Sequence, residues 1–166
     1  MNTKLMFSSE TDLWATPQEF FAKLNDEFKF TLDPRSTHKN AKCDKHYTLS
    51  ENGLSQNWNG EIVFCNPPYS KSEKPCKLIC KKKKCIERGY HIKEYVPGQE
   101  DWIKKCYEES RNANTKVVML LPVRTDTLAF HRYIYKVAKE IRFVKGRIKF
   151  GESDNAAPFP SMVVVY

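Results

Sequence analysis

An apolar run that stops at an asparagine and two prolines is the stretch of this sequence best suited to chemistry. Residues 62–65 are apolar, and Asn66-Pro67-Pro68-Tyr69 follow them directly. Because prolines cannot continue a hydrogen-bonded ladder, a strand over 62–65 must end at Asn66. The carboxyl ends of strands form the ligand-binding edge of open α/β sheets, so we expect Asn66 and Tyr69 to be presented there on a stiff loop.

The loop offers groups that could hold and activate a ring amine. Asn66 and Pro67 each carry a carbonyl that could accept a hydrogen bond from a planar amino group. Tyr69 could stack on the ring that bears this amine. Two acceptors on the amine hydrogens would favour a pyramidal nitrogen, whose lone pair is then free to attack. The alternative interpretation is a plain Pro-Pro turn without chemistry.

The Asn66–Tyr69 loop resembles the catalytic motif of S-adenosylmethionine-dependent amino-methyltransferases. The whole chain resembles the small phage-type, Dam-like DNA N6-adenine methyltransferases. The motifs that carry this resemblance follow the family's order from about residue 12 to the C-terminus, and they are Trp14-Ala15-Thr16-Pro17, Thr31-Leu32-Asp33-Pro34, Gly53-Leu54 with Trp58, Asn66 to Tyr69, Val117 to Pro122 with 124–127, Phe130-His131, 145–150 and 157–161. Only the stretch from about 71 to 100 looks like an insertion.

The resemblance implies a small Rossmann-like methyltransferase domain that transfers a methyl group from S-adenosylmethionine to the N6 amine of adenine in DNA. The adenine would be flipped out of the duplex to reach the loop. The catalytic residues implied are Asn66, Pro67, Pro68 and Tyr69. The cofactor contacts implied are Trp14, Thr16, Pro17, Asp33, Pro34 and Asn66, with the Asp33 carboxylate near the cofactor's ammonium. A phage or prophage origin, with a role in restriction-modification, is implied in the same way.

Two other functions remain open from the sequence. The same loop could hold an amine of RNA, the N4 amine of cytosine or the amide of a protein glutamine. Alternatively, the chain could be a non-catalytic, zinc-stabilised nucleic-acid-binding module with a vestigial cofactor pocket, which would show no heat of binding with S-adenosylmethionine.

Composition indicates one soluble domain over residues 1–166, with 40% hydrophobic and 29% charged residues. No apolar run approaches the ~20 residues of a membrane span, and no signal peptide is recognisable. We therefore expect a cytoplasmic protein, and the resemblance implies a bacterial host cell. The sequence does not reveal the oligomeric state, and we favour a monomer. The net charge is +8, and residues 71–105 hold 11 Lys/Arg against 5 Asp/Glu. A basic surface beside the loop favours DNA as the partner, although a solvated lysine-rich face gives the same pattern.

The insertion contains a possible metal site. Cys76, Cys80, Cys85 and His91 lie within 16 residues of one another, and three thiolates with one imidazole are a ligand set of structural zinc. If the segment is helical, Cys76 and Cys80 lie one turn apart and could chelate together. A zinc-loaded basic segment next to the loop could clamp or recognise DNA. The alternative is free cysteines on a basic helical hairpin.

Four further cations are candidates for DNA contact. Arg124 follows the apolar run 116–122 at the same predicted sheet edge. Lys145, Arg147 and Lys149 surround a glycine, which suits a loop that binds a phosphate backbone.

Patterning predicts alternating strands and helices, and therefore a mostly parallel α/β sheet with an antiparallel final hairpin. Thr16 is predicted to cap a helix over 17–27, with Glu19 completing a capping box. Further helices are expected at 101–110 and 128–138. Strands are expected at 28–32, 46–48, 62–65, 116–122, 140–144 and 162–166.

Overall fold

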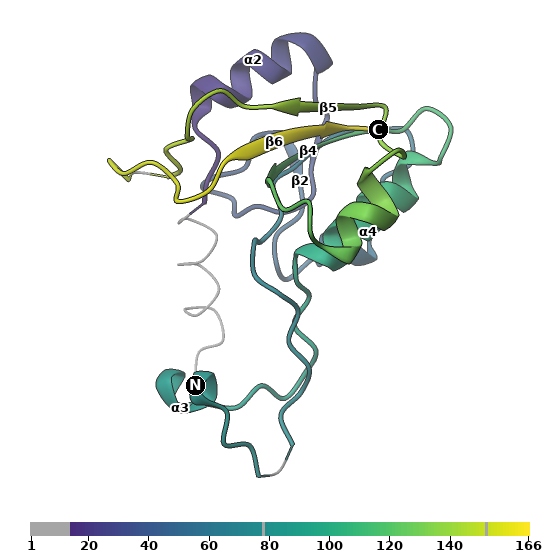
Figure 1. The fold of residues 1–166 in the computed structure, drawn as a ribbon. Coiled ribbons are helices and arrows are strands. Elements are labelled where there is room, and N and C mark those ends of the chain that lie inside the picture. The colour runs from purple at the N-terminus through teal and green to yellow at the C-terminus, as the bar shows by residue number, and fades with distance from the viewer. Residues whose placement is uncertain (1–13, 78, 152) are drawn as a thin grey trace.

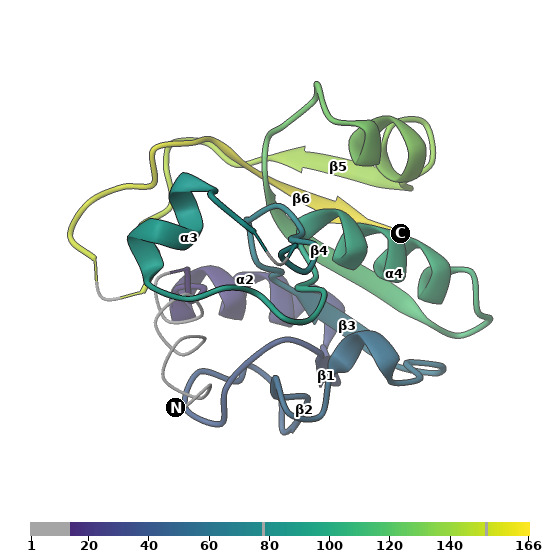
Figure 2. The same cartoon turned by 90° about the horizontal axis from the view of Figure 1, so that it is seen from below.

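The computed structural model describes residues 14–77, 79–151 and 153–166, and a six-stranded sheet lies at its centre (Figure 1). The strands are β1 (Leu32–Asp33), β2 (Lys45–His46), β3 (Ile62–Cys65), β4 (Lys116–Pro122), β5 (Glu140–Phe143) and β6 (Ser161–Val165), in the order β2-β1-β3-β4-β6-β5. Strands β2, β1, β3 and β4 pair in parallel, and β6 is antiparallel to both of its neighbours. The predicted α/β sheet with an antiparallel last strand is confirmed. Figure 2 shows β2 and β5 at opposite edges of the sheet.

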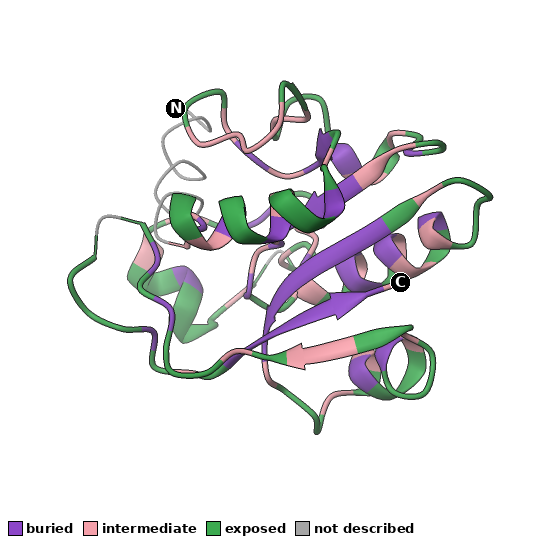
Figure 3. Cartoon of the chain, turned by 90° about the horizontal axis from the view of Figure 1, so that it is seen from above, coloured by how far each residue is buried: buried purple, intermediate pink, exposed green. Residues whose placement is uncertain are grey.

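Successive residues of the central strands point to opposite faces of the sheet, and both faces are covered. On one face, Val117 and Met119 of β4 belong to a core cluster that includes residues of α4 (Gln99–Ser110) and of the π-helical turn η2 (Phe130–Ile134). On the other face, Val118 and Leu120 pack with residues of α2 (Gln18–Phe28). Strands β4 and β6 are therefore buried along most of their length (Figure 3). Burial on both faces explains their almost uninterrupted apolar sequences.

The predicted capping of the first helix is wrong. Pro17 occupies the N-cap position of α2, and no side chain makes a cap hydrogen bond there. The Thr16 hydroxyl accepts a hydrogen bond from the Asn66 amide instead. A contact between residues 50 positions apart has replaced the local one that the capping pattern indicates.

Two elements are shorter than predicted. The strand expected at 28–32 is confined to β1, because α2 continues to Phe28 and Lys29 then ends it in a left-handed conformation. The alternation of Phe28 and Phe30 reflects stacking of their rings, with centroids 5.6 Å apart, and not a strand. The helix expected at 128–138 is reduced to η2 and its first residues, since Tyr135 is extended and Lys136 has a positive φ of 59°.

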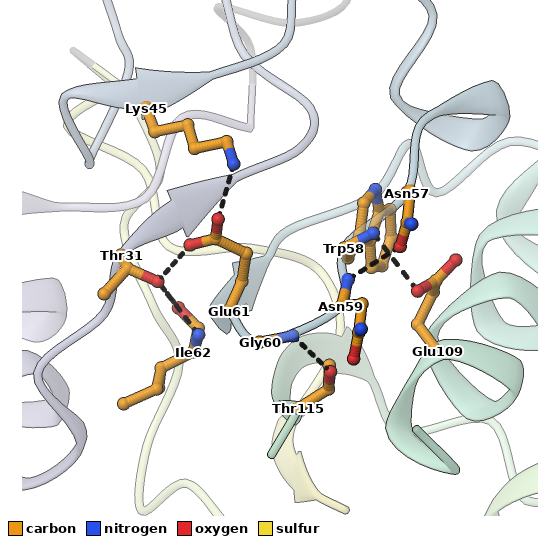
Figure 4. A network of polar contacts seen from close by, with 10 residues as sticks. All are labelled: Thr31, Lys45, Asn57, Trp58, Asn59, Gly60, Glu61, Ile62, Glu109 and Thr115. Atoms are coloured by element: carbon orange, nitrogen blue, oxygen red, sulfur yellow. Dashed lines mark hydrogen bonds and ion pairs between the residues drawn. The ribbon is translucent and has the colours of Figure 1, made fainter. Parts of the chain in front are cut away.

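The amino ends of β1 and β3 are tied by a polar network on the opposite edge from the Asn66 loop (Figure 4). The Glu61 carboxylate accepts hydrogen bonds from Thr31 Oγ1 at 2.6 Å and from Lys45 Nζ at 2.5 Å. The Lys45 and Thr31 hydrogen bonds lower the pKa of Glu61, so the carboxylate stays charged at neutral pH. This network fixes the register of β3, and hence the position of the loop that follows it.

A second anchor near β3 is Trp58, which is fully buried. Its backbone N–H donates to Glu109 of α4, and its indole N–H donates to the carbonyl of Gly53, the first residue of the 3-10 turn η1 (Gly53–Ser55). Figure 4 shows the Glu109 contact beside the approach to β3. The bulky ring thus fastens the segment before β3 to α4.

Residues 71–98, called the arm below, leave the sheet after the Asn66 loop and return to α4 (Figure 1). The outgoing and returning segments pair through an antiparallel bridge between Glu73 and Val96, and the far end carries α3 (Lys83–Arg88). The basic helical hairpin, the alternative to a metal site, is not formed, because α3 is the only helix among the described residues of the arm. Across the part of the chain that the structure describes, no helix is long and apolar enough to cross a membrane.

Candidate active site and metal-ligand cluster

One pocket joins the carboxyl ends of β1 and β3. Asp33 ends β1, Asn66 follows β3, and parallel pairing places them at the same edge. The pocket contains about 470 Å³ of empty space, its open mouth included, and is lined by Trp14, Ala15, Thr16, Asp33, Arg35, Ser36, Asn40, Lys42, Phe64, Asn66, Pro67 and Pro68. Candidate catalytic and cofactor residues from three separate stretches of sequence therefore share one concave site. Pro17, Pro34 and Tyr69 are not part of its lining.

The amide of Asn66 is held in one orientation. Its Nδ2 donates to the carbonyl oxygen of Trp14 at 2.7 Å and to Thr16 Oγ1 at 3.0 Å. Its Oδ1 accepts a hydrogen bond from the Tyr69 hydroxyl at 2.8 Å. Because both donors and one acceptor position are engaged, the amide cannot rotate without breaking several hydrogen bonds. Oδ1 retains a second lone pair for an incoming donor.

Tyr69 differs from the exposed loop residue that the sequence suggests, since only 7% of it is accessible. Its ring centroid lies 5.8 Å from Trp14, 6.0 Å from Phe150 and 5.4 Å from Phe159. Burial raises the pKa of its hydroxyl above the ordinary value of 10, so the group remains protonated and donates to Asn66. The surrounding aromatic rings come from segments far apart in the sequence, which is why the loop motif does not reveal this burial.

Asp33 is a buried carboxylate facing the same pocket, with 4% of its surface accessible. Its Oδ2 accepts a hydrogen bond from the backbone N–H of Lys42 at 3.0 Å, and its Oδ1 accepts one from that of Arg35 at 3.2 Å. Burial raises the pKa of Asp33, and these hydrogen bonds offset only part of the effect. A cationic ligand group in the pocket would favour the ionised carboxylate.

Ser36 is a pocket residue that sequence reasoning missed. It is 4% accessible, and its Oγ has no hydrogen-bond partner among the described residues. A buried hydroxyl without a partner costs free energy, so Ser36 is a candidate for a contact with a bound ligand. Its place in the loop directly after Asp33-Pro34 is the sequence signal that could have identified it. Lys42 and Asn40, which also line the pocket, carry no such signal.

The four candidate DNA-binding cations are all exposed. Arg124 follows β4, and Lys145, Arg147 and Lys149 lie in the segment after β5. Their neighbours Ile148 and Phe150 are buried, so this segment alternates between apolar residues facing the core and cations facing solvent. None of the four forms an ion pair with another described residue.

The arm brings its three cysteines and one histidine together. The ligand atoms of Cys76, Cys80, Cys85 and His91 all lie within 4.8 Å of one another. Cys85 Sγ is 3.5 Å from Cys76 Sγ and 3.6 Å from Cys80 Sγ, and all three thiols are free. The single helical turn expected between Cys76 and Cys80 is wrong, because these two lie outside α3. The fold of the arm assembles the cluster instead.

Arg88 connects this cluster to Glu73. Its Nη2 donates to Cys85 Sγ at 3.3 Å, and its Nη1 pairs with Glu73 at 3.1 Å. Glu73 also pairs with Lys84. Desolvation raises the pKa of Cys76, but hydrogen bonds from Cys85 and His91 outweigh it and lower that pKa to about 6. The surroundings therefore favour the thiolate of Cys76, the metal-binding form of cysteine, whereas burial raises the pKa of Cys85.

The sheet is mostly parallel and its carboxyl edge carries the Asn-Pro-Pro-Tyr loop near a buried acidic residue. The arrangement of the strands is that of a Rossmann-like methyltransferase fold. The sequence profile of the DNA N-6-adenine-methyltransferase (Dam) family matches residues 3–164, and the chain belongs to this family. It is thus an enzyme that methylates the N6 amine of adenine in DNA. Membership also implies S-adenosylmethionine as the methyl donor.

Curated relatives agree with this assignment. The DNA N-6-adenine-methyltransferase of Haemophilus phage HP1 is 30% identical over 99% of this chain and 82% of its own length. The enzyme of the same description from Escherichia phage T1 is 38% identical over 74% of this chain and 50% of its own length. A putative methyltransferase, YfdM, of Escherichia coli K12 is 37% identical over 35% of this chain and 71% of its own length.

Proposed function

We propose that the Asn66–Tyr69 loop holds the amine of a flipped-out adenine while S-adenosylmethionine occupies the pocket at the ends of β1 and β3. The observation that carries this proposal is the orientation of Asn66. Because Trp14 and Thr16 accept both amide hydrogens of Asn66, the amide presents a lone pair of Oδ1 to the site and no N–H. Such a group accepts from an amine and repels a ring nitrogen with a lone pair.

The pocket residues suit the cofactor's chemistry. S-adenosylmethionine, when bound, supplies a methyl group on a positively charged sulfur. The buried Asp33 carboxylate would pair with the cofactor's ammonium, and the unpartnered Ser36 hydroxyl would gain a hydrogen bond. The half-buried Trp14 ring would cover an apolar part of the molecule. Pro34 is buried and does not line the pocket, so it would support the lining residues from behind.

The loop residues would position the adenine. Asn66 Oδ1 and the Pro67 carbonyl would accept the two amine hydrogens, which would leave the nitrogen lone pair free to take up the methyl group that the cofactor supplies. Pro68 stiffens the loop, and Tyr69 stacks on the base after leaving its contact with Asn66. Asn66 cannot act as a carboxylate base, so the proton leaves the methylated amine for water. Most of the rate gain is positioning.

The decisive experiment uses unmethylated DNA and methyl-labelled cofactor, followed by digestion and identification of the labelled nucleoside. Label in N6-methyladenine with the wild-type protein, and its loss in Asn66→Ala, are expected. Asn59→Ala is the matched control, since Asn59 is exposed before β3 at the opposite edge of the sheet. Equal labelling by Asn66→Ala and the wild type would refute the role of the loop.

We also propose that the exposed Arg124, Lys145, Arg147 and Lys149 contact DNA phosphates. Replacing Arg147 by Gln is expected to weaken binding to all duplex sequences alike and to reduce the salt dependence of binding by about one ion. An unchanged salt dependence would remove Arg147 from the interface. The protein is expected to act as a monomer, which light scattering with and without DNA would test.

A structural zinc ion in the cluster of Cys76, Cys80, Cys85 and His91 is the last part of the proposal. A tetrahedral zinc with Zn–S distances of about 2.3 Å places its sulfurs about 3.8 Å apart, and the sulfur separations of 3.5 and 3.6 Å are close to this. Protein purified without added metal is expected to carry about one zinc per chain, and Cys80→Ser to lose it. Cys43→Ser, outside the cluster, is the control. Far less than one equivalent in the wild type would end this idea.

A further inference from the structure

We infer that the arm, organised by a metal ion at its cysteine–histidine cluster, is a duplex-DNA-holding element that grips the sugar–phosphate backbone beside the adenine being methylated. This inference rests on the proposed function, because it takes DNA as the substrate and zinc as the ligand of the cluster. The inference goes beyond the proposed function in two respects. It names the surface that holds the duplex, and it makes the affinity of the protein for DNA depend on the metal.

The arm has too little apolar burial to hold its shape alone. Among its described residues only Cys85, Ile92 and Gly98 are buried. Segments of this size without a core normally need a metal or disulfides. Its other internal contacts include the Glu73–Val96 bridge, a backbone hydrogen bond between Cys76 and Ile92, and the ion pairs of Glu73. Metal binding at the cluster would join the outgoing segment, α3 and the returning segment in one unit.

The arm carries an excess of cations that its own acids do not neutralise. Residues 71–98 contain nine Lys/Arg and three Glu. Glu73 pairs with Lys84 and Arg88, and Glu87 pairs with Lys83. Six further lysines are without a carboxylate partner among the described residues, and these are Lys71, Lys74, Lys77, Lys81, Lys82 and Lys93. Such a surface matches the regular negative charge of a DNA backbone.

Two exposed isoleucines flank the lysine run, which a purely solvated face would not require. Ile79 is 83% accessible and Ile86 is 70% accessible. Apolar side chains among cations suit a nucleic-acid surface, where deoxyribose and base steps provide apolar contacts next to phosphates. This composition favours a nucleic-acid surface over a solubilising one.

The root of the arm fixes its position relative to the catalytic loop. The backbone N–H of Gln99 donates to the Ser70 carbonyl at 2.8 Å. Gly98 packs so closely that an added Cβ would lie 2.0 Å from the nitrogen of Ser72. Ser70 follows Tyr69 directly, so both ends of the arm meet next to the loop, and Figure 1 shows α3 extending away from the sheet. A duplex with one base at the loop would therefore pass along the arm.

The test measures the affinity of the full-length, metal-loaded protein for a labelled unmethylated duplex as a function of salt. The arm variant is K77Q/K81Q/K82Q, and the matched control is K23Q/K29Q/K139Q, three exposed lysines of the body. If all three arm lysines contact phosphates, the slope of log affinity against log salt falls by about 2.7, and affinity at 0.1 M salt falls by up to about 500-fold. The control variant should bind like the wild type.

Metal dependence is measured on the same wild-type protein before and after treatment with a zinc chelator. The expected result is a loss of DNA affinity close to that of the arm variant, restored by adding zinc. Equal losses in the arm and body variants, or unchanged binding after confirmed zinc removal, would overturn the inference. Preferential binding of single-stranded RNA over duplex DNA by the arm would also overturn it.

A separate readout distinguishes failure of this inference from failure of the proposed function. The arm variant is expected to keep the wild-type heat of S-adenosylmethionine binding, and at saturating DNA it should still form N6-methyladenine. A wild-type protein that forms no N6-methyladenine would refute the proposed function, whereas the binding comparison between variants would still decide the role of the arm.

Discussion

Replacing Asn66 with aspartate tests whether the amide hydrogens of this residue are needed. An aspartate side chain is nearly isosteric but has no N–H, so an ionised carboxylate oxygen would face the Trp14 carbonyl, which now accepts at 2.7 Å. Thr16 could turn its hydroxyl to donate, but the Trp14 carbonyl has no such freedom. The two acceptors must separate, or the carboxyl must take up a proton.

The free-energy cost of this change comes mainly from the Trp14 carbonyl, which would have no donor. Leaving a partly buried acceptor unsatisfied beside a charge costs about 2–4 kcal/mol. If the same free energy separates the productive loop from a displaced one, methylation falls by about 30- to 900-fold. Both numbers follow from geometry in which asparagine is a donor, and neither would apply if Asn66 served only as an acceptor.

The pH dependence has a definite sign. Repulsion by Trp14 raises the pKa of the introduced carboxyl above the ordinary aspartate value of about 3.9. A raised folded-state pKa means that destabilisation is absent below that ordinary value, grows as pH rises toward the folded-state pKa, and is complete above it. Urea unfolding of Asn66→Asp at pH 5 and 8 should therefore show a larger deficit against the wild type at pH 8.

Asn59→Asp is the matched control, because Asn59 is exposed and lies on the opposite sheet edge. Its stability should stay within about 0.5 kcal/mol of the wild type at both pH values. An Asn66→Asp protein that is as stable and as active at pH 8 as the wild type would refute the donor role of Asn66.

Three further predictions follow from contacts elsewhere. Thr16→Val removes one of the two acceptors of the Asn66 amide and should lower the methylation rate about fivefold (~1 kcal/mol), with Thr16→Ser restoring it. Gly98→Ala introduces a Cβ against backbone at the root of the arm and should lower the free energy of unfolding by about 1–3 kcal/mol in urea titrations. Arg142 forms hydrogen bonds with Glu27 of α2 and Glu140 of β5, and these lower the pKa of both carboxyl groups below the ordinary value of 4.5. The stability difference between the wild type and Arg142→Gln should therefore be constant above pH 5 and shrink as pH falls below about 4.5.

The parts of the fold that the sequence predicts are those set by local pattern. Strand β4 coincides with the predicted residues 116–122, because a doubly buried strand is a continuous apolar run ended by proline. The position of Asn66 after β3 is predictable for the same reason. Parallel pairing of β1 with β3 then brings Asp33 to the same pocket.

The parts that the sequence does not reveal depend on contacts between distant segments. Thr16 looks like a helix cap, and only its meeting with Asn66 across 50 residues shows its actual partner. Tyr69 looks exposed in a loop until Phe150 and Phe159 enclose it. The pocket role of Ser36 depends on the shape of a whole loop, which no spacing encodes.

The way the arm joins the domain has an evolutionary consequence. The backbone N–H of Gln99 donates to the Ser70 carbonyl, so the two ends of the arm are joined directly to each other. A short turn could replace the intervening residues, and a different segment could be grafted onto the same two ends. On the inference that the arm holds the duplex, such an exchange would change how tightly the enzyme binds DNA while leaving the residues of the Asn66–Tyr69 loop in place.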